Sequence, residues 1–256
     1  MDKVKFALNK IFDLLGYRIF KKQKDFHYIP DIYGKNSRKM NDIRSRRDFF
    51  SAAKKVIDEK KTSLYYDRLF YLYEGLANSA KNNSDGILDI LEIGVNRGGS
   101  SYFLAEIARN FFSGKINMYS VDTFEGHSEK DLAGEGEGKS HKAHHYSETT
   151  SFETVLNYLS GFPFVKVLKG RIQDRAEDLV SPKFNFIHLD VDIYEPTVWA
   201  LEFFSKRMKS GGIIIVDDYG YITCPGVKKA VDAFYEKEKL IKVELQSGQC
   251  MLIFPF

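Results

Sequence analysis

The sequence has few cysteines and no long apolar run. Its two cysteines, Cys224 and Cys250, belong to no CxxC pair and allow one disulfide at most, which excludes a disulfide scaffold and fits a reducing cytoplasm. No run of about 18 apolar residues is present, which argues against a transmembrane helix. Lys10, Asp13 and Gly16 interrupt the apolar residues near the N-terminus. We therefore expect no secretory signal and a cytoplasmic protein.

Charge is distributed unevenly along the chain. The formal net charge is only +3 over 256 residues, which by itself favours no class of partner. Residues 1–50 contain thirteen Lys and Arg against six Asp and Glu, a local charge of +7, so the remaining residues together carry −4. A basic segment of this kind suits an acidic substrate, a membrane surface or nucleic acid, and it is equally typical of a solvated arm.

The first 80 residues are predicted to form a helical, basic extension. Residues 4–20 place apolar side chains at helical spacing among lysines and arginines, which is typical of an amphipathic helix. Packing of this helix on the core or on a second subunit is favoured, so we expect a homo-oligomer, most simply a dimer. Contact with a membrane surface is the less favoured alternative. Residues 21–47 are expected to form a loop or arm, and residues 48–80 two helical stretches.

Residues 81–256 are predicted to form one α/β domain, because strand and helix patterns alternate strictly from residue 87. The expected strands are 87–94, 115–124, 164–170, 184–190, 212–218, 240–246 and 250–256. The expected helices are 99–111, 149–159, 173–179, 195–208 and 225–239. The last two strands flank Ser247 and Gly248 and must form an antiparallel hairpin. We therefore expect a mostly parallel seven-stranded sheet with helices on both faces and an antiparallel C-terminal hairpin.

Four aspartates follow two of these strands. Asp190 and Asp192 end one apolar run and alternate along it, so they share one side if the strand continues that far. Asp217 and Asp218 end the next apolar run. The carboxyl ends of parallel strands meet at one edge of a sheet, so all four carboxylates are expected together. Such like charges repel one another unless a cation or protons intervene.

A glycine-rich turn follows the first predicted strand. Gly94, Gly98 and Gly99 would let the backbone turn tightly and approach a ligand, and the helix that follows offers N–H groups to a carboxylate or phosphate. The turn is not the dinucleotide fingerprint, because Asn96 takes the place of the second glycine. Asp122 ends the second strand, where an acidic residue either binds ribose hydroxyls or caps a turn. Together the two features favour a nucleoside ligand.

Residues 127–150 are rich in Gly, Glu and His and separate a strand from the helix that follows it. A segment of this length at the ligand-binding edge of a doubly wound sheet is usually functional or disordered. We expect it to form a lid over the substrate. Its histidines His144 and His145 are candidate bases, and a solvated, flexible position is their other interpretation.

Several motifs resemble those of known enzymes. Glu92-x-Gly94 with Ser100, followed by Asp122 at the end of the second strand, is similar to the cofactor motif of class I S-adenosylmethionine-dependent methyltransferases. The segments that resemble the macrocin O-methyltransferase family are 122–126, 190–194, 217–220 and 224–226. The resemblance covers about residues 86–256. It implies a Rossmann-like class I methyltransferase fold and Mg²⁺-dependent methylation of a sugar hydroxyl on a natural product.

The resemblance assigns roles to individual residues. The cofactor-binding residues that we predict are Glu92, Gly94, Asn96, Ser100, Asp122 and Gln173. Among them, Ser100 is assigned to the amino-acid end of S-adenosylmethionine, Asp122 to its ribose and Gln173 to its adenine. The predicted Mg²⁺ ligands are Asp190, Asp217 and Asp218. The candidate catalytic residues are Asp190, Asp192, His144 and His145.

Mg²⁺ suits this carboxylate set, because it prefers oxygen ligands and keeps positions open for substrate. A hydroxyl bound to it loses its proton more easily, and a base must then accept that proton. Asp192 is a further ligand or this base. The sequence favours Asp190 over Asp192 as the primary ligand, because Asp190 lies at the strand tip, but it leaves the division of roles open.

Other functions remain open at this point. Residues 190–192 also form a DxD motif, by which glycosyltransferases hold a cation against a nucleotide sugar, but the glycine turn with Asp122 favours methyl transfer. A non-catalytic binding module that has kept the fold is a third hypothesis. We expect no nucleic-acid substrate, because no Asn-Pro-Pro-Tyr signature is present and the carboxylates would repel phosphates. The expected acceptor is a sugar-containing small molecule, such as a glycoside, a secondary metabolite or a surface polysaccharide precursor.

Overall fold

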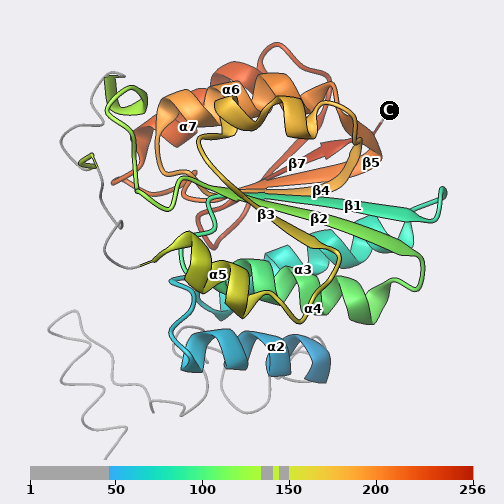
Figure 1. Ribbon diagram of the computed structural model, residues 1–256. Coiled ribbons are helices and arrows are strands. Elements are labelled where there is room, and N and C mark those ends of the chain that lie inside the picture. Colours follow the sequence, from blue (N-terminus) through green and yellow to red (C-terminus); the bar gives the residue numbers. More distant parts are fainter. Residues whose placement is uncertain (1–45, 134–140, 144–149, 256) are drawn as a thin grey trace, which may run out of the picture. The chain divides into compact units, whose positions relative to one another are not determined.

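The residues that the computed structural model describes are 46–133, 141–143 and 150–255 (Figure 1). By its internal contacts the chain divides into two compact units, Met1–Asp42 and Ile43–Phe256, and all described residues belong to the second. The predicted amphipathic helix 4–20, with its expected part in a dimer or at a membrane surface, lies outside the described residues.

A seven-stranded sheet forms the centre of the second unit (Figure 1). Its strands are β1 (Ile87–Ile93), β2 (Lys115–Asp122), β3 (Val165–Lys169), β4 (Phe184–Leu189), β5 (Met208–Val216), β6 (Ile241–Glu244) and β7 (Cys250–Phe254). They lie in the order β3-β2-β1-β4-β5-β7-β6. Strands β1 to β5 pair in parallel, whereas β7 pairs antiparallel with both β5 and β6. The predicted mostly parallel sheet with an antiparallel C-terminal hairpin is confirmed.

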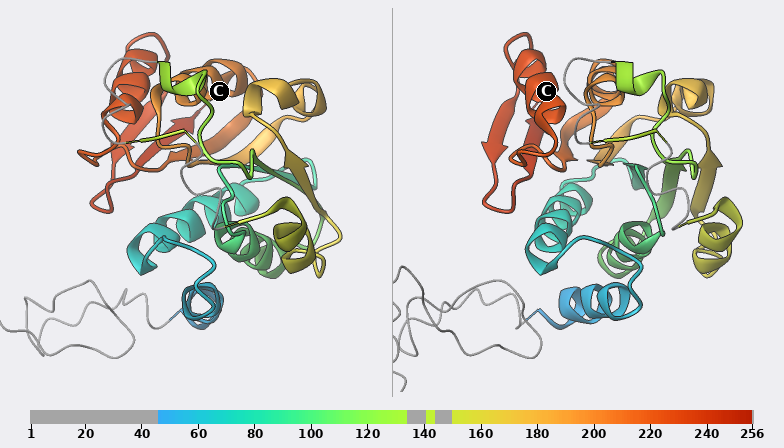
Figure 2. Two further views of the ribbon diagram at one scale, coloured as in Figure 1. Left: turned by 60° about the vertical axis from the view of Figure 1, so that its left-hand side comes forward. Right: turned by 90° about the vertical axis from the view of Figure 1, so that its left-hand side faces the viewer.

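Helices cover both faces of the sheet. The α-helices are α2 (Arg47–Asp58), α3 (Tyr66–Lys81), α4 (Gly99–Phe111), α5 (Phe152–Tyr158), α6 (Tyr194–Ser205) and α7 (Pro225–Tyr235). Short 3₁₀ turns are η3 (Asp131–Ala133), η6 (Ile172–Arg175) and η7 (Glu177–Leu179). Helices α3, α4 and α5 lie on one face and α6 and α7 on the other (Figures 1 and 2), while α2 packs on α4. None of the described helices is long and apolar enough to cross a membrane.

Two predicted elements differ from the structure in kind or in where one element gives way to the next, while most other boundaries shift by a few residues. The helix expected at 173–179 is a pair of 3₁₀ turns, η6 and η7. Helix α6 ends at Ser205 rather than at Met208, which instead begins β5 and pairs with Phe184 across a shift in register. Gly211, at a φ of +75°, provides the left-handed backbone that this irregular stretch of β5 requires.

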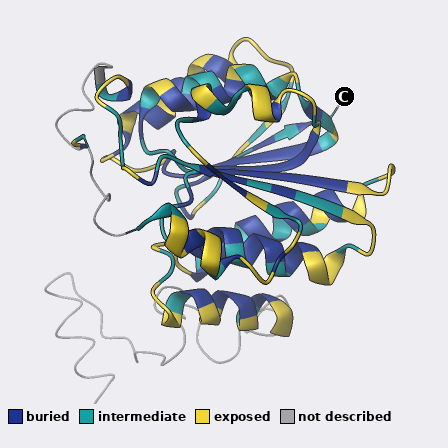
Figure 3. Cartoon of the chain, viewed as in Figure 1, coloured by how far each residue is buried: buried dark blue, intermediate teal, exposed yellow. Residues whose placement is uncertain are grey.

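The two helices before β1 pack directly on the rest of the domain (Figure 3). The ring of Phe49 in α2 is fully buried and meets those of Tyr73 at 5.5 Å and Phe103 at 6.0 Å, measured between centroids. In α3, a Cβ added to Gly75 would lie 2.8 Å from the ring of Phe186 in β4. Because α3 lies this close to the sheet, its side chains reach the ends of the strands.

Replacing Phe49 by Ala should lower the free energy of unfolding by about 3–5 kcal/mol, since it removes a large buried ring and leaves a cavity. Urea denaturation of the full chain measures this change. The control is Leu156→Ala, because Leu156 is 45% exposed and its loss should cost less than about 1 kcal/mol. Equal effects of the two substitutions would show that α2 is not part of the cooperative core.

Candidate functional site

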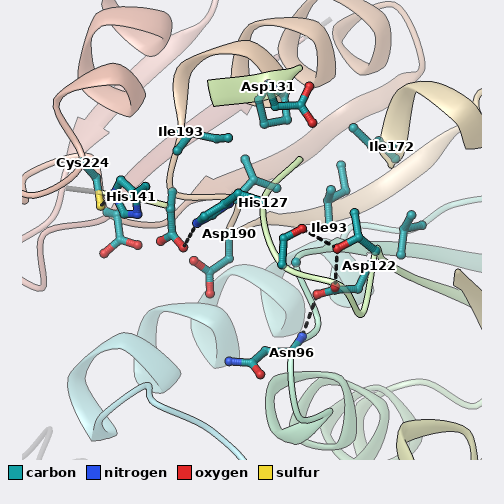
Figure 4. A pocket seen from close by; sticks show the side chains of 18 of the residues that line it. Ile93, Asn96, Asp122, His127, Asp131, His141, Ile172, Asp190, Ile193 and Cys224 are labelled. Carbon is teal, nitrogen blue, oxygen red and sulfur yellow. Dashed lines mark hydrogen bonds and ion pairs between the residues drawn. The ribbon is translucent and has the colours of Figure 1, made fainter. Parts of the chain in front are cut away.

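A cavity of about 570 Å³ opens at the carboxyl ends of the parallel strands (Figure 4). Its lining includes the ends of β1 and β2, residues that follow β3, β4 and β5, and the described part of the segment 127–150. Strand order reverses between β1 and β4, and open α/β sheets bind their ligands at such a reversal. The cavity thus lies at the edge of the sheet where the sequence predicts a ligand.

The turn after β1 brings two stretches of backbone very close together. Gly94 has a φ of +92°, and a Cβ there would lie 1.7 Å from the carbonyl oxygen of Asp190. Glycine is therefore required at this position. Gly94 and Asn96, both predicted at the cofactor, line the cavity. The first amide of α4, on Gly99, donates to the carbonyl oxygen of Lys61 at 3.0 Å, so this helix N–H is already paired.

Asp122 holds the glycine turn against the end of β2. Its Oδ2 accepts hydrogen bonds from the backbone amides of Val95 at 2.7 Å and Asn96 at 2.8 Å. Its Oδ1 accepts a third from the amide of Phe124 at 2.7 Å. Asp122 also lines the cavity. Turn capping, one of the two roles predicted for this carboxylate, is therefore present, and the carboxylate lies where a ligand in the cavity can reach it.

Glu92 and Ser100, also predicted at the cofactor, do not line the cavity. Glu92 is fully buried, and its carboxylate accepts a hydrogen bond from Ser101 and lies 2.9 Å from Nδ1 of His188. Ser101 in turn lies 3.1 Å from the hydroxyl of Ser120. This polar network joins β1, α4, β2 and β4 beneath the glycine turn. Sequence spacing places Glu92 near the turn but does not reveal that its side chain points into the interior.

Gln173 lines the cavity as part of a second polar group. Arg171 donates two hydrogen bonds to Asp131, Nε to Oδ2 at 2.9 Å and a terminal nitrogen to Oδ1 at 2.5 Å. Gln173 Nε2 donates to the same carboxylate at 3.3 Å. Burial alone would raise the pKa of Asp131, but Arg171 and Ser128 lower it below its ordinary value. This group fixes the segment that follows β2 against the turn that follows β3.

The four predicted aspartates do come together at the ends of β4 and β5. Burial, and then the charges of Asp217 and Asp218, raise the pKa of Asp190 well above its ordinary value. Burial and the neighbouring Asp218 raise the pKa of Asp192 in the same way. Asp192 and Asp218 also have positive φ angles of 64° and 57°. Such backbone costs on the order of 1–3 kcal/mol per residue and is found preferentially at functional sites.

Arg68 of α3 is a functional residue that the sequence does not predict. One terminal nitrogen lies 2.9 Å from Asp217 Oδ2 and the other lies 3.0 Å from Asp218 Oδ1. The guanidinium also stands 4.3 Å from the ring centroid of Tyr221. Burial alone would lower the pKa of Arg68, but the two carboxylates outweigh it and raise the pKa. Arg68 therefore acts as the internal counter-ion of the aspartates.

Arg68→Met should lower the free energy of unfolding by about 3 kcal/mol in metal-free buffer, because it leaves buried carboxylates without their cation. Urea denaturation measures this loss. Arg109→Met is the control: Arg109 is 52% exposed and pairs with Glu106, so its loss should cost less than about 1 kcal/mol. If Arg68→Met were no more harmful than the control, Arg68 would not be the counter-ion of the cluster.

Two histidines other than the predicted ones lie at the cavity. His144 and His145 lie outside the described residues. His127 and His141, from the same segment, line the cavity, with His127 Nε2 3.7 Å from Asp192 Oδ2. Their ring centroids are 5.2 Å apart. Composition shows that this segment is rich in histidine, but it does not single out His127 and His141.

The fold and the site define a class I S-adenosylmethionine-dependent O-methyltransferase. The solved structure of the O-methyltransferase NovP has the same fold, with a TM-score of 0.67 and 23% identity over 76% of this chain and 82% of that chain. The chain belongs to the macrocin O-methyltransferase family: the model of that family, Macrocin-O-methyltransferase (TylF), matches residues 27–250. This membership favours methyl transfer over both the DxD glycosyltransferase and the non-catalytic module.

Two curated relatives carry similar sequences. One is 8-demethyl-8-(2,3-dimethoxy-alpha-L-rhamnosyl)-tetracenomycin-C 4'-O-methyltransferase from Streptomyces olivaceus, 28% identical over 185 residues, which are 70% of this chain and 67% of the relative. The other is demethyldecarbamoylnovobiocin O-methyltransferase from Streptomyces niveus, 29% identical over 162 residues, which are 61% of this chain and 60% of the relative. The similarity to the second relative thus spans only three fifths of that protein.

Proposed function

We propose that the protein transfers the methyl group of S-adenosylmethionine to a hydroxyl of a sugar-containing small molecule, with a divalent cation such as Mg²⁺ held by Asp190, Asp217 and Asp218. The observation that carries this proposal is the gathering of four aspartates beside the guanidinium of Arg68. Three of them, Asp190, Asp192 and Asp218, line the cavity. A structural role alone gives no reason for the fold to retain so many buried carboxylates beside one cation.

The aspartates suit a cation of this kind. Asp217 Oδ1 is buried and has no hydrogen-bond partner within the described ranges, although a buried carboxylate oxygen is normally paired. Arg68 contacts Asp217 and Asp218 but neutralises only one of the negative charges. Oxygen donors from carboxylates are the ligands that Mg²⁺ prefers. When bound, such a cation polarises an acceptor hydroxyl so that its proton leaves more easily.

Asp192 is our proposed acceptor of that proton. It lies two residues after Asp190, lines the cavity, and is held in a strained backbone conformation with its side chain 22% exposed. In the reaction, the acceptor oxygen forms a bond to the methyl carbon as the bond from sulfur to that carbon breaks. The hydroxyl proton passes to Asp192, and S-adenosylhomocysteine is the product that leaves. A positioned base of this kind typically contributes about 10²- to 10⁴-fold to the rate.

Four other residues of the cavity lining are proposed to bind the cofactor. Gly94 and Asn96 allow the turn to approach the amino-acid part of S-adenosylmethionine, and Asp122 is placed to accept hydrogen bonds from the ribose. Gln173, which lines the cavity from the turn η6 after β3, is proposed at the adenine. Glu92 is proposed to act indirectly, by supporting the start of α4 through Ser101.

We propose that the acceptor is a sugar of a secondary metabolite or of a surface polysaccharide precursor. The names of the two relatives specify O-methylation of a rhamnosyl derivative of tetracenomycin C and of demethyldecarbamoylnovobiocin. Vicinal hydroxyls of a sugar offer the paired oxygens that a divalent cation binds well. The side chains that surround the acceptor in the cavity would determine which sugar binds and which of its hydroxyls is methylated.

Isothermal titration calorimetry of the full chain tests the cofactor assignment. We expect S-adenosylmethionine and S-adenosylhomocysteine to bind, and a nucleotide sugar such as UDP-glucose to bind no more tightly in the presence of Mg²⁺ than in its absence. Failure of S-adenosylmethionine to bind at millimolar concentration would overturn the proposal. Cation-dependent binding of the nucleotide sugar in its place would favour the DxD glycosyltransferase.

A further inference from the structure

A second group of metal-ligand side chains lies beside the aspartate cluster. Ligand atoms of His127, His141 and Asp192 all lie within 4.8 Å of one another. His127 Nε2 and Asp192 Oδ2 are 3.7 Å apart, close to the roughly 3.4 Å that separates two ligands of a tetrahedral ion with bonds of about 2.1 Å. Figure 4 shows His127 and His141 at the same end of the cavity, near Asp190 and Cys224.

The hydrogen bonding of His141 resembles that of a metal ligand. His141 is only 6% exposed, and its Nε2 lies 3.0 Å from the carbonyl oxygen of Thr223. A carbonyl oxygen only accepts, so Nε2 carries the proton and Nδ1 carries the lone pair. Nδ1 is buried and has no hydrogen-bond partner in the part of the chain that the structure describes. Metal-binding histidines typically donate their other ring N–H to a carbonyl or carboxylate in this way.

The donor atoms of this group differ in kind from those of the proposed Mg²⁺ site. Two imidazole nitrogens and one carboxylate oxygen suit Zn²⁺ and other divalent first-row transition metals, whereas Mg²⁺ takes oxygen ligands. Asp190 and Asp217 offer carboxylate oxygens, and one ring nitrogen of His188 lies within 4.8 Å of them. The two groups adjoin one another because Asp192 follows Asp190 by two residues, yet each can be removed by substitutions that leave the other intact.

We propose that His127, His141 and Asp192 form a binding site for a divalent transition-metal ion such as Zn²⁺, separate from the proposed Mg²⁺ site of Asp190, Asp217 and Asp218. The site takes one ion, with a fourth position left to water or to an acceptor atom. An ion bound there holds the carboxylate of Asp192, so Zn²⁺ should inhibit methyl transfer. That consequence rests on the proposed function, whereas the binding itself does not.

Zn²⁺ titration of the metal-stripped full chain, in millimolar Mg²⁺, tests the proposal by calorimetry. We expect one equivalent of Zn²⁺ to bind the unsubstituted protein. His127→Asn and His141→Asn should each weaken this binding at least about tenfold, as expected for loss of one ligand from a three-residue site, and leave Mg²⁺ affinity unchanged. Unchanged Mg²⁺ affinity also verifies that each variant is folded.

Asp217→Asn provides the reciprocal test, because Asp217 belongs only to the proposed Mg²⁺ site in this assignment. It should weaken Mg²⁺ binding and leave Zn²⁺ binding unchanged. Co²⁺ added in place of Zn²⁺ should give visible absorption bands that disappear in His141→Asn. The proposal is overturned if no Zn²⁺ binds, if Asp217→Asn removes Zn²⁺ binding, or if that binding depends on His144 and His145 rather than on His127 and His141. Loss of Mg²⁺ binding alone would count against the proposed cation site and not against this one.

Discussion

Asp217→Asn is expected to lower kcat/KM for methyl transfer by about 10²- to 10³-fold, on the scale of losing one preorganised electrostatic group from an active site. The substitution keeps the size of the side chain and removes one negative charge from the group that is proposed to hold the cation. Asp217 is not among the residues that line the cavity, where the cofactor is proposed to bind. The affinity for S-adenosylmethionine, measured by calorimetry, should therefore stay within about threefold of the unsubstituted value.

The matched control for Asp217 is Asp58→Asn. Asp58 is 60% exposed and pairs with Lys54 one helical turn away, so its substitution should leave kcat/KM unchanged. Initial rates over a range of Mg²⁺ concentrations provide the measurement. An Asp217→Asn enzyme that kept both its rate and its Mg²⁺ dependence would remove this residue from the cation site.

Asp192→Asn is expected to lower kcat by about 10²- to 10⁴-fold with little change in the affinity for cation or cofactor, because an amide cannot accept the hydroxyl proton. Single-turnover rates and Mg²⁺ titrations on the same protein separate the two effects. Asp190→Asn is the comparison variant, and it should weaken cation binding as well as the rate. If Asp192→Asn instead lost the cation and Asp190→Asn retained it, the assigned roles of the two residues would be exchanged.

The position of the aspartate cluster follows from sequence alone. Apolar runs that end in Asp190 and Asp217 read as buried parallel strands, and parallel topology brings their carboxyl ends to one edge. The same periodicity predicts nearly every strand and helix after residue 87. The short turns η6 and η7 and the start of β5 at Met208 differ from the predicted elements, because local glycine and bulge geometry determines where these elements begin and end.

Long-range contacts are what the sequence leaves undetermined. Arg68 meets Asp217 across 149 residues, and nothing in the α3 sequence distinguishes it from other helical arginines. Glu92 has the spacing of a cofactor-binding residue, yet its carboxylate turns inward to Ser101 and His188 because the interior there offers it polar partners. Such choices depend on packing between elements, which local periodicity does not encode.

The histidines illustrate the same limit. His144 and His145 remain predicted candidates for a base and lie outside the described residues. Among the described residues, His127 lies near Asp192, and His141 lies at the start of α7, at the carbonyl oxygen of Thr223. Residue type is readable from the sequence, whereas the selection among similar residues depends on how the segment packs against β4 and α7.

Mass spectrometry of reaction products tests the central claim most directly. The full chain is incubated with S-adenosylmethionine and a panel of glycosides and sugar nucleotides, with Mg²⁺ or with a chelator. We expect at least one sugar-containing acceptor to gain the mass of one methyl substitution in Mg²⁺ and not in chelator, with S-adenosylhomocysteine formed as the second product. A methylated product formed equally well in chelator would contradict the role assigned to Asp190, Asp217 and Asp218.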